Sequence, residues 1–135
     1  IAKIVSAKIK KKKKVKLWGT GKPKREFLFV DDLAYAILYL LKLPKTKIRK
    51  IVKNFPIINI GSGEEISIKN LSHKIKKICK YNGKIFFDAS YPDGTPKKNL
   101  DSSIINKIGW KAKTKLDNGL KIVLKNYLKS NSLFS

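Results

Sequence analysis

Apolar positions along the chain follow two patterns. In some segments they recur every three or four residues, and elsewhere they form short continuous runs bounded by Gly, Pro or Asn. The first pattern predicts amphipathic helices, because residues i, i+3 and i+4 share one helix face, and the second predicts strands. Since strands and helices alternate, the chain is predicted to have an α/β fold.

Capping residues and helix breakers indicate where the helices begin and end. Asp31 or Asp32 is expected to cap the second helix, Pro44 to stop it, and Ser67 to cap the third. The predicted helices are 1–11 with Ile1, Ile4, Val5 and Ile9 inward; about 31–43 with Leu33, Ile37, Leu40 and Leu41 inward; about 67–81 with Ile68, Leu71, Ile75 and Ile78 inward; a short helix from Asp101 or Ser102 to Gly109; and 116–129 with Leu120, Val123, Leu124, Tyr127 and Leu128 inward.

The apolar run Ile57–Ile60 is interpreted as a buried strand, because Gly61 follows it directly and ends it. The domain prediction is a single region over 1–130 followed by a frayed tail over 131–135. Further strands are predicted at 15–17, 26–30 and 84–87, a basic connection at 44–56, and a long polar loop at 88–98.

The chain of 135 residues has the length of about one domain. A single cysteine, Cys79, excludes an internal disulfide, and with His73 as the one histidine a structural zinc site is not expected. No apolar run approaches the roughly 20 residues that span a bilayer, and no signal peptide is recognised. We therefore expect a cytoplasmic protein without a membrane segment. Because Met is absent, the first residue is interpreted as a cut rather than a biological start.

The net charge of +23 at pH 7, with the run Lys10–Lys14, would ordinarily indicate nucleic-acid binding. The Lys residues are nevertheless spread along every predicted element, which favours a solvated surface. A basic nucleic-acid module would show one basic face with exposed aromatic residues, whereas scattered Lys and mostly buried aromatic residues are expected here. Binding to a specific nucleic acid is therefore not predicted.

Two polar loops concentrate side chains suited to an anionic, hydroxyl-rich ligand. Trp18 and Arg25 bracket a loop containing Gly19, Gly21 and Pro23. Trp18 offers an aromatic surface, and Arg25 can meet a phosphate with two parallel hydrogen bonds. In a chain that uses Lys almost everywhere, an Arg indicates that the planar guanidinium matters. A plain turn with Trp18 as a core residue is the alternative interpretation.

The second loop contains Pro92-Asp-Gly-Thr-Pro96 and then Lys98. Asp93 offers an acceptor for hydroxyl or base N–H groups, and Lys98 a positive charge. In this order the two loops resemble the carboxyl-terminal portion of the GDP-L-fucose synthase family, and the resemblance covers essentially the whole chain. It implies that Trp18, Arg25, Asp93 and Lys98 contact a GDP-sugar, and a looser alignment adds Lys3.

The resemblance also implies a fold: the carboxyl-terminal substrate-binding part of an extended short-chain dehydrogenase/reductase, lacking most of the Rossmann domain. The strand near 57–60 would belong to the Rossmann sheet. The family's nucleotide-binding glycines and its catalytic Ser, Tyr-x-x-x-Lys, Cys and His have no counterpart here. NADPH would thus be bound mainly by the missing amino-terminal region. Phe29 departs from the family pattern, which has His at that position.

Two sequence features do not replace the missing motifs. Tyr35 and Tyr39 are four residues apart, but position 39 would have to be Lys. Gly61-Ser-Gly63 lacks the third glycine of a dinucleotide fingerprint, because Ile66 stands there. The chain alone is therefore predicted to be inactive. The implied parent enzyme is a homodimer that converts GDP-4-keto-6-deoxymannose.

Three other interpretations stay open. The chain could derive from another sugar-nucleotide epimerase or dehydratase of the same superfamily, although Pro92-Asp-Gly-Thr-Pro96 favours the fucose synthase family. It could be a small basic nucleic-acid-binding module, for which exposed aromatic residues on one basic face would be the sign. It could also be a non-catalytic domain that binds a nucleotide sugar or a partner.

Overall fold

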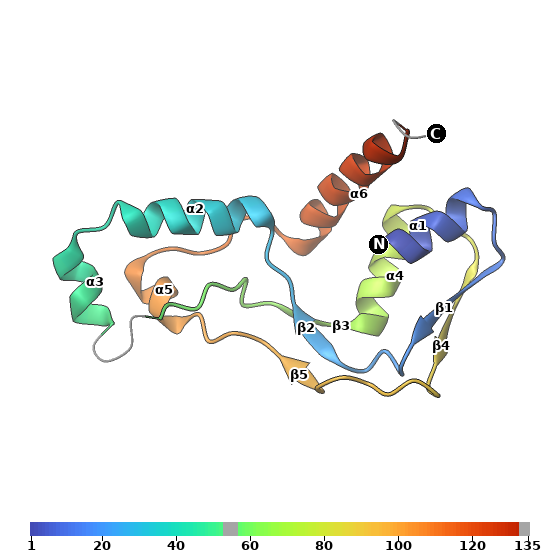
Figure 1. Ribbon diagram of the computed structural model, residues 1–135, viewed down its shortest axis with the longest axis horizontal. Helices are drawn as coiled ribbons and strands as arrows, with labels where there is room; N and C mark the ends of the chain where they lie inside the picture. Colours follow the sequence, from blue (N-terminus) through green and yellow to red (C-terminus); the bar gives the residue numbers. More distant parts are fainter. Residues whose placement is uncertain (53–56, 133–135) are drawn as a thin grey trace. The chain divides into compact units, whose positions relative to one another are not determined.

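The computed structural model describes residues 1–52 and 57–132, and the chain divides into two compact units. The first unit comprises Ile1–Arg25, Ile66–Lys98 and Asp117–Ser135, and the second comprises Glu26–Glu65 and Asn99–Leu116. Figure 1 labels the helices and strands of both units. Each unit is therefore assembled from segments that are distant in the sequence.

The first unit is built on a parallel pair of strands. β1 (Lys14–Trp18) pairs with β4 (Lys84–Asp88), with Trp18 and Asp88 as register partners at the ends of the strands. Three helices, α1 (Ala2–Ile9), α4 (Ile68–Ile78) and α6 (Leu116–Ser132), complete it. Its buried core consists of Ile4, Val5, Ala7, Val15, Ile75, Cys79 and Tyr81, with Ile1, Leu71, Ile85, Leu120, Leu124 and Tyr127 packed against it.

A second, smaller sheet carries part of the candidate site. Its three strands, in the order β3-β2-β5, are β3 (Glu65–Ser67), β2 (Lys24–Glu26) and β5 (Lys97–Lys98). β2 and β5 run parallel, with Lys24 opposite Lys97 and Arg25 opposite Lys98. The Lys24 backbone N–H also donates to the Pro96 carbonyl at 2.8 Å, which brings the second loop beside the first.

The second unit is mainly helical. It contains α2 (Val30–Leu41), α3 (Lys45–Ile51) and α5 (Ser103–Ile108). Gly109 ends α5 at φ 109°, a left-handed conformation that glycine adopts without a Cβ penalty. Its buried core is Ala36, Ile105 and Trp110, with Leu28, Tyr39, Leu40, Ile58, Ile60 and Ala112 packed against it.

Much of the predicted order of elements is confirmed. Ser67 caps α4, since its Oγ accepts from the Asn70 N–H at 3.1 Å. Gly109 closes α5, as expected. Ile9 was expected to face inward, but it is exposed because the helix ends there. The confirmed elements are the helices over 2–9, 30–41, 68–78, 103–108 and 116–132 and the strands over 14–18 and 84–88.

The predicted cap of α2 is wrong, and of its predicted inward face only Leu40 packs on the second core. The N-cap is Phe29 without a side-chain hydrogen bond, and the buried Asp32 accepts instead from the Thr114 N–H at 2.8 Å. The fully buried residue of the helix is Ala36, whereas Leu41 is 76% exposed. A small side chain lets Ile105 and Trp110 approach closely, so the buried stripe is rotated away from the larger apolar residues predicted to form it, Leu33, Ile37 and Leu41.

Four segments differ from the sequence predictions. The expected connection at 44–56 contains α3, since the run after Pro44 has good helix formers; residues 53–56 lie outside the described residues. Ile57–Ile60 forms no strand with any described residue, but Ile58 and Ile60 pack on the second core while Ile57 is exposed. Its place in a Rossmann sheet stays a prediction. The strand expected at 26–30 lies at 24–26, and α6 extends to Ser132, into the predicted tail.

Candidate functional site

The two predicted loops are tied together by one carboxylate. The loop after β1 and the loop after β4 leave the same end of a parallel strand pair, so they start side by side. Asp93 accepts a hydrogen bond from the Thr20 N–H at 2.8 Å and another from the Thr20 hydroxyl. These two bonds lower the pKa of Asp93 below its ordinary value of 3.8, because they stabilise the charged form. Asp93 therefore links the two loops.

The link between Asp93 and Thr20 explains why position 19 is a glycine. Gly19 has φ 77°, and a Cβ at this position would collide with the Asp93 carboxylate. A larger residue would therefore be strained and would also push the second loop away. The Gly19 N–H further donates to the Asp88 carbonyl at 2.9 Å, which continues the pairing of β1 with β4 into the loop.

Trp18, at the end of β1, lies in an aromatic stack. Its ring is nearly parallel to that of Tyr91, with centroids 4.7 Å apart and an interplanar angle of 10°. The Lys3 ammonium lies 4.7 Å from the Trp18 ring centroid, in cation–π geometry. Trp18 is nevertheless 62% exposed. The alternative interpretation of Trp18 as a core residue is therefore wrong, and a large aromatic surface stays open to a ligand.

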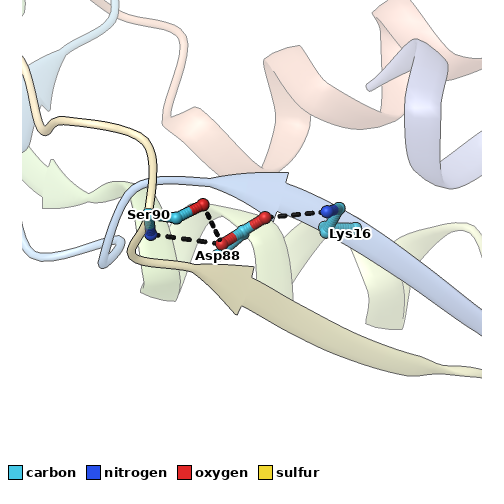
Figure 2. A network of polar contacts seen from close by, with 3 residues as sticks. All are labelled: Lys16, Asp88 and Ser90. Atoms are coloured by element: carbon cyan, nitrogen blue, oxygen red, sulfur yellow. Dashed lines mark hydrogen bonds and ion pairs between the residues drawn. The ribbon is translucent and has the colours of Figure 1, made fainter.

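A carboxylate network at the end of β4 places the start of the second loop. Figure 2 shows Asp88 between Lys16 and Ser90. Asp88 accepts from the Lys16 ammonium at 2.7 Å and from the Ser90 hydroxyl and N–H at 2.7 and 3.1 Å. The Lys16 bond, followed by the two Ser90 bonds, lowers the pKa of Asp88 to about 2. Because Ser90 precedes Tyr91, this turn directs the Tyr91 ring toward Trp18.

Arg25 and Lys98 form a pair of cations on neighbouring strands. They are register partners of β2 and β5, so their side chains project from the same side of the sheet. Like charges placed directly opposite destabilise a sheet unless an anion balances them. The Arg25 Nη1 donates to the Lys24 carbonyl at 2.6 Å and the Thr95 carbonyl at 2.8 Å. These bonds orient the guanidinium, and Nη2 and Nε bond to no group within residues 1–52 and 57–132.

All five residues predicted to bind substrate therefore lie in the first unit. The structure pairs Lys3 with Trp18 and Arg25 with Lys98, and it links the two loops through Asp93. Sequence reasoning missed Thr20, Asp88 and Tyr91. The loop sequence Trp18-Gly-Thr-Gly21 held the signal for Thr20, whose hydroxyl can reach a carboxylate, whereas the stack of Tyr91 on Trp18 depends on strand register.

The Gly61-Ser-Gly63 turn has a structural partner in the second unit. The Gly63 N–H donates to Glu26 Oε1 at 2.6 Å, and Leu100 N–H donates to Glu26 Oε2 at 2.9 Å. A Cβ at Gly61 would collide with the same carboxylate. A phosphate at this turn would be repelled by the Glu26 carboxylate and would have to displace it. The turn therefore does not suit the pyrophosphate of a dinucleotide.

Other expectations are settled by burial. Cys79 is buried and His73 is exposed. The expectation that the aromatic residues are mostly buried is wrong: over the described ranges only Tyr81 and Trp110 are buried. The exposed ones occupy strand ends, loops or outer faces: Trp18, Phe27, Tyr35, Phe86 and Tyr91. Within the described part of the chain no cluster of three or more His, Cys, Asp or Glu side chains could hold a metal ion. No described helix is long and apolar enough to cross a membrane.

Comparison with solved structures defines the class of the fold. Residues 1–61 match the model of the NAD dependent epimerase/dehydratase family. A GDP-6-OMe-4-keto-L-xylo-heptose reductase from C. jejuni is 37% identical with a TM-score of 0.79, over 88% of this chain and 35% of that chain. An NADP-bound GDP-L-fucose synthetase from Naegleria fowleri superposes with a TM-score of 0.81 at 21% identity, over 97% of this chain and 39% of that one, and so supports the fold alone. The chain has the α/β fold of part of an extended short-chain dehydrogenase/reductase.

Sequence comparison then points to one group within that class. The probable GDP-L-fucose synthase 1 of Oryza sativa subsp. japonica is 40% identical over 96% of this chain, and the GDP-L-fucose synthase of Escherichia coli (strain K12) is 36% identical over 89%. The chain spans 37% and 38% of the length of these relatives. The predicted similarity to the GDP-L-fucose synthases is confirmed, over little more than a third of their length.

Proposed function

We propose that this chain is the substrate-binding portion of a GDP-L-fucose synthase-like enzyme, which acts on GDP-4-keto-6-deoxy-D-mannose by 3,5-epimerisation and NADPH-dependent 4-reduction. The similarity to named GDP-L-fucose synthases supports the reaction. The observation that carries the substrate class is the register pairing of Arg25 with Lys98 beside the two linked loops. Two adjacent cations suit a diphosphate, which carries its charge on neighbouring phosphoryl groups.

Each predicted residue receives a role in this proposal. Arg25 and Lys98 bind the diphosphate, and Lys3 adds a third positive charge. Trp18 packs on the ligand with its exposed ring. Asp93 has a revised role, since both its oxygens already accept from Thr20: it holds the Trp18 loop in place, and its remaining lone pairs can accept from a ligand hydroxyl.

We assign no cofactor contact to the described residues. NADPH supplies the hydride when bound, and the Glu26-bonded turn at Gly61 does not suit its pyrophosphate. The cofactor site therefore belongs, in this proposal, to other parts of a longer protein. That protein is proposed to act in the cytoplasm as a homodimer, as the family resemblance implies.

Calorimetric titration of the 135-residue chain with GDP tests the substrate class. Replacing both Arg25 and Lys98 by Ala should reduce the affinity at least about 10-fold, since each charge-assisted bond contributes roughly 1.5–3 kcal/mol. The matched control replaces Lys42 and Lys45, two exposed Lys residues of the second unit, by Ala and removes the same charge. An equal loss in the control would show that diffuse charge, rather than the Arg25–Lys98 pair, attracts GDP.

A second candidate function is non-specific binding of single-stranded nucleic acid. A groove of about 1020 Å³ on the first unit is lined by Lys3, Lys12, Lys14, Lys16 and Lys84 around Phe86, which is 56% exposed. Basic grooves with exposed aromatic rings bind single strands with little sequence preference. Such binding should weaken steeply with salt through counterion release. Salt-sensitive binding of single-stranded oligonucleotides without sequence preference, together with no measurable affinity for GDP, would favour this function over the first.

A further inference from the structure

Tyr91 shares the surface aromatic cluster with Trp18 but has no part in the proposed function so far. Both rings are exposed, Trp18 by 62% and Tyr91 by 40%, although they stack on each other. Core packing therefore does not explain the stack. Tyr91 covers one face of the Trp18 indole, and the Lys3 ammonium lies 4.7 Å from the centroid of the same ring.

Hydrogen bonds to Asp88 at the end of β4 fix the position of Tyr91. Asp88 accepts from the hydroxyl and N–H of Ser90, and its carbonyl accepts from the Tyr91 N–H at 3.3 Å. Trp18 is the register partner of Asp88. The end of β4 thus fixes both the start of the second loop and the strand end that carries the indole. Lys16, bonded to Asp88, lies 5.9 Å from the Tyr91 ring centroid.

We propose that Tyr91 is a positioning residue that holds the Trp18 indole flat, so that the face of Trp18 turned away from Tyr91 receives the purine base of the nucleotide ligand. This rests on the proposed function, which supplies a purine nucleoside diphosphate. Nucleobases stack on exposed aromatic rings, and a two-ring purine covers more of an indole than a pyrimidine does. On binding, the base displaces the Lys3 ammonium from the ring, and the freed ammonium turns to the phosphates.

The chemistry around the ring agrees with an anionic, planar ligand. An ammonium over an indole is held by the ring quadrupole and is readily exchanged for a stronger anionic partner. Over residues 1–52 and 57–132 no carboxylate is recorded on Lys3, whereas Lys16 is already paired with Asp88. Lys3 is therefore the cation at this platform that can bind phosphate without breaking an existing ion pair.

Titrations of the full 135-residue chain with GDP, UDP and inorganic pyrophosphate test the proposal. Replacement of Trp18 by Leu should weaken GDP binding about 5- to 150-fold, the range found when a base loses its aromatic partner. Tyr91→Leu should lower the ratio of GDP to UDP affinity toward one, and Tyr91→Phe should restore it, because the ring is kept. Pyrophosphate affinity should be the same in all variants. GDP should also quench Trp18 fluorescence, and UDP should quench it less.

Tyr35→Leu is the matched control, because Tyr35 is 66% exposed in the second unit. Equal GDP and UDP affinities in the wild type, or an unchanged ratio in Tyr91→Leu, would overturn the purine platform. If pyrophosphate still binds through Arg25 and Lys98 in that case, the proposed function survives. If none of the three ligands binds, both proposals fail.

Discussion

Asp93 accepts two hydrogen bonds from Thr20, a residue 73 positions earlier in the chain. The pair joins the loop after β1 to the loop after β4, and these loops together with the strand residues that flank them include four of the five residues predicted to bind substrate. Asp93 was expected from sequence to contact the ligand, but its first role is to link the two loops. The position of Trp18 relative to the second loop depends on it.

Thr20→Val directly tests the link between Thr20 and Asp93. Valine keeps the shape of threonine but removes the hydroxyl donor, so the pKa of Asp93 should rise toward its ordinary value of 3.8. Thr20→Ser should keep the lowered pKa. NMR titration of the Asp93 carboxyl measures the shift. Because the folded pKa is lowered, the stability due to Asp93 should be present above pH 3.8 and lost as the pH falls through the folded pKa. An unchanged Asp93 pKa in Thr20→Val would contradict the role of the hydroxyl.

Arg25→Lys tests whether the guanidinium geometry matters. Lysine keeps the charge but cannot bond two phosphate oxygens in parallel, nor keep the contacts of Nη1 with the Lys24 and Thr95 carbonyls. The loss of one charge-assisted bond costs roughly 1.5–3 kcal/mol, so GDP affinity should fall about 10- to 150-fold. Arg25→Ala should bind GDP at least as weakly.

Lys24→Ala is the control for Arg25, since Lys24 is exposed and adjacent. Calorimetric titration with GDP compares the variants. Equal affinities of the wild type and Arg25→Lys would remove the bidentate role. A larger loss in Lys24→Ala would place the phosphate on the opposite side of β2.

Asp88→Asn tests the network of Figure 2. Asparagine can still accept from the Ser90 N–H and hydroxyl, but it loses the ion pair with Lys16. The Asp88 pKa of about 2 predicts that the wild type loses this contribution to stability only as the pH falls from 3.8 toward about 2. Urea unfolding at pH 5 and at pH 2 should therefore show a difference between the proteins at the higher pH that shrinks at the lower. A difference independent of pH would point to packing instead.

Glu26→Ala tests the carboxylate that holds the Gly63 and Leu100 amides. Both N–H groups lose a charged acceptor, and bonds of this kind contribute roughly 1.5–3 kcal/mol each. Hydrogen exchange at the two amides should speed up, while exchange in β1 of the first unit should not change. Glu26→Gln, which keeps one carbonyl oxygen, should lie between. Fast exchange confined to Gly63 would restrict the role of Glu26 to the turn.

The chain alone should not oxidise NADPH in the presence of the keto sugar. Nothing in the described residues supplies the family's Tyr-x-x-x-Lys motif, and Tyr35 and Tyr39 are followed by no lysine at the required spacing. The absorbance of NADPH should stay constant with the purified polypeptide. A sustained, substrate-dependent decrease would overturn the assignment of the catalytic groups to other parts of a longer protein.

Several elements could be predicted from sequence because their signals are local. Ser67 caps α4 through a bond to Asn70, three residues on, and Gly109 ends α5 because few residues adopt its φ. The residue types at Trp18 and Asp93 indicated that the loops after β1 and β4 could contact a ligand. Hydrophobic spacing placed α1, α4 and α6 in the same way, since each helix presents one repeating face to the core. On α6 that face is Leu120, Leu124 and Tyr127, whereas Val123 and Leu128, predicted to face inward, are exposed.

The tertiary structure decided what these signals left open. The face that α2 buries is set by Ile105 and Trp110, which come some 70 residues later, so the small Ala36 is buried rather than Leu33 or Leu41. In the site, strand register places Arg25 beside Lys98 and stacks Tyr91 on Trp18. Sequence alone determined which chemical groups are present and which local turns form. Which of those groups meet depends on pairings between distant segments, and only the folded chain fixes them.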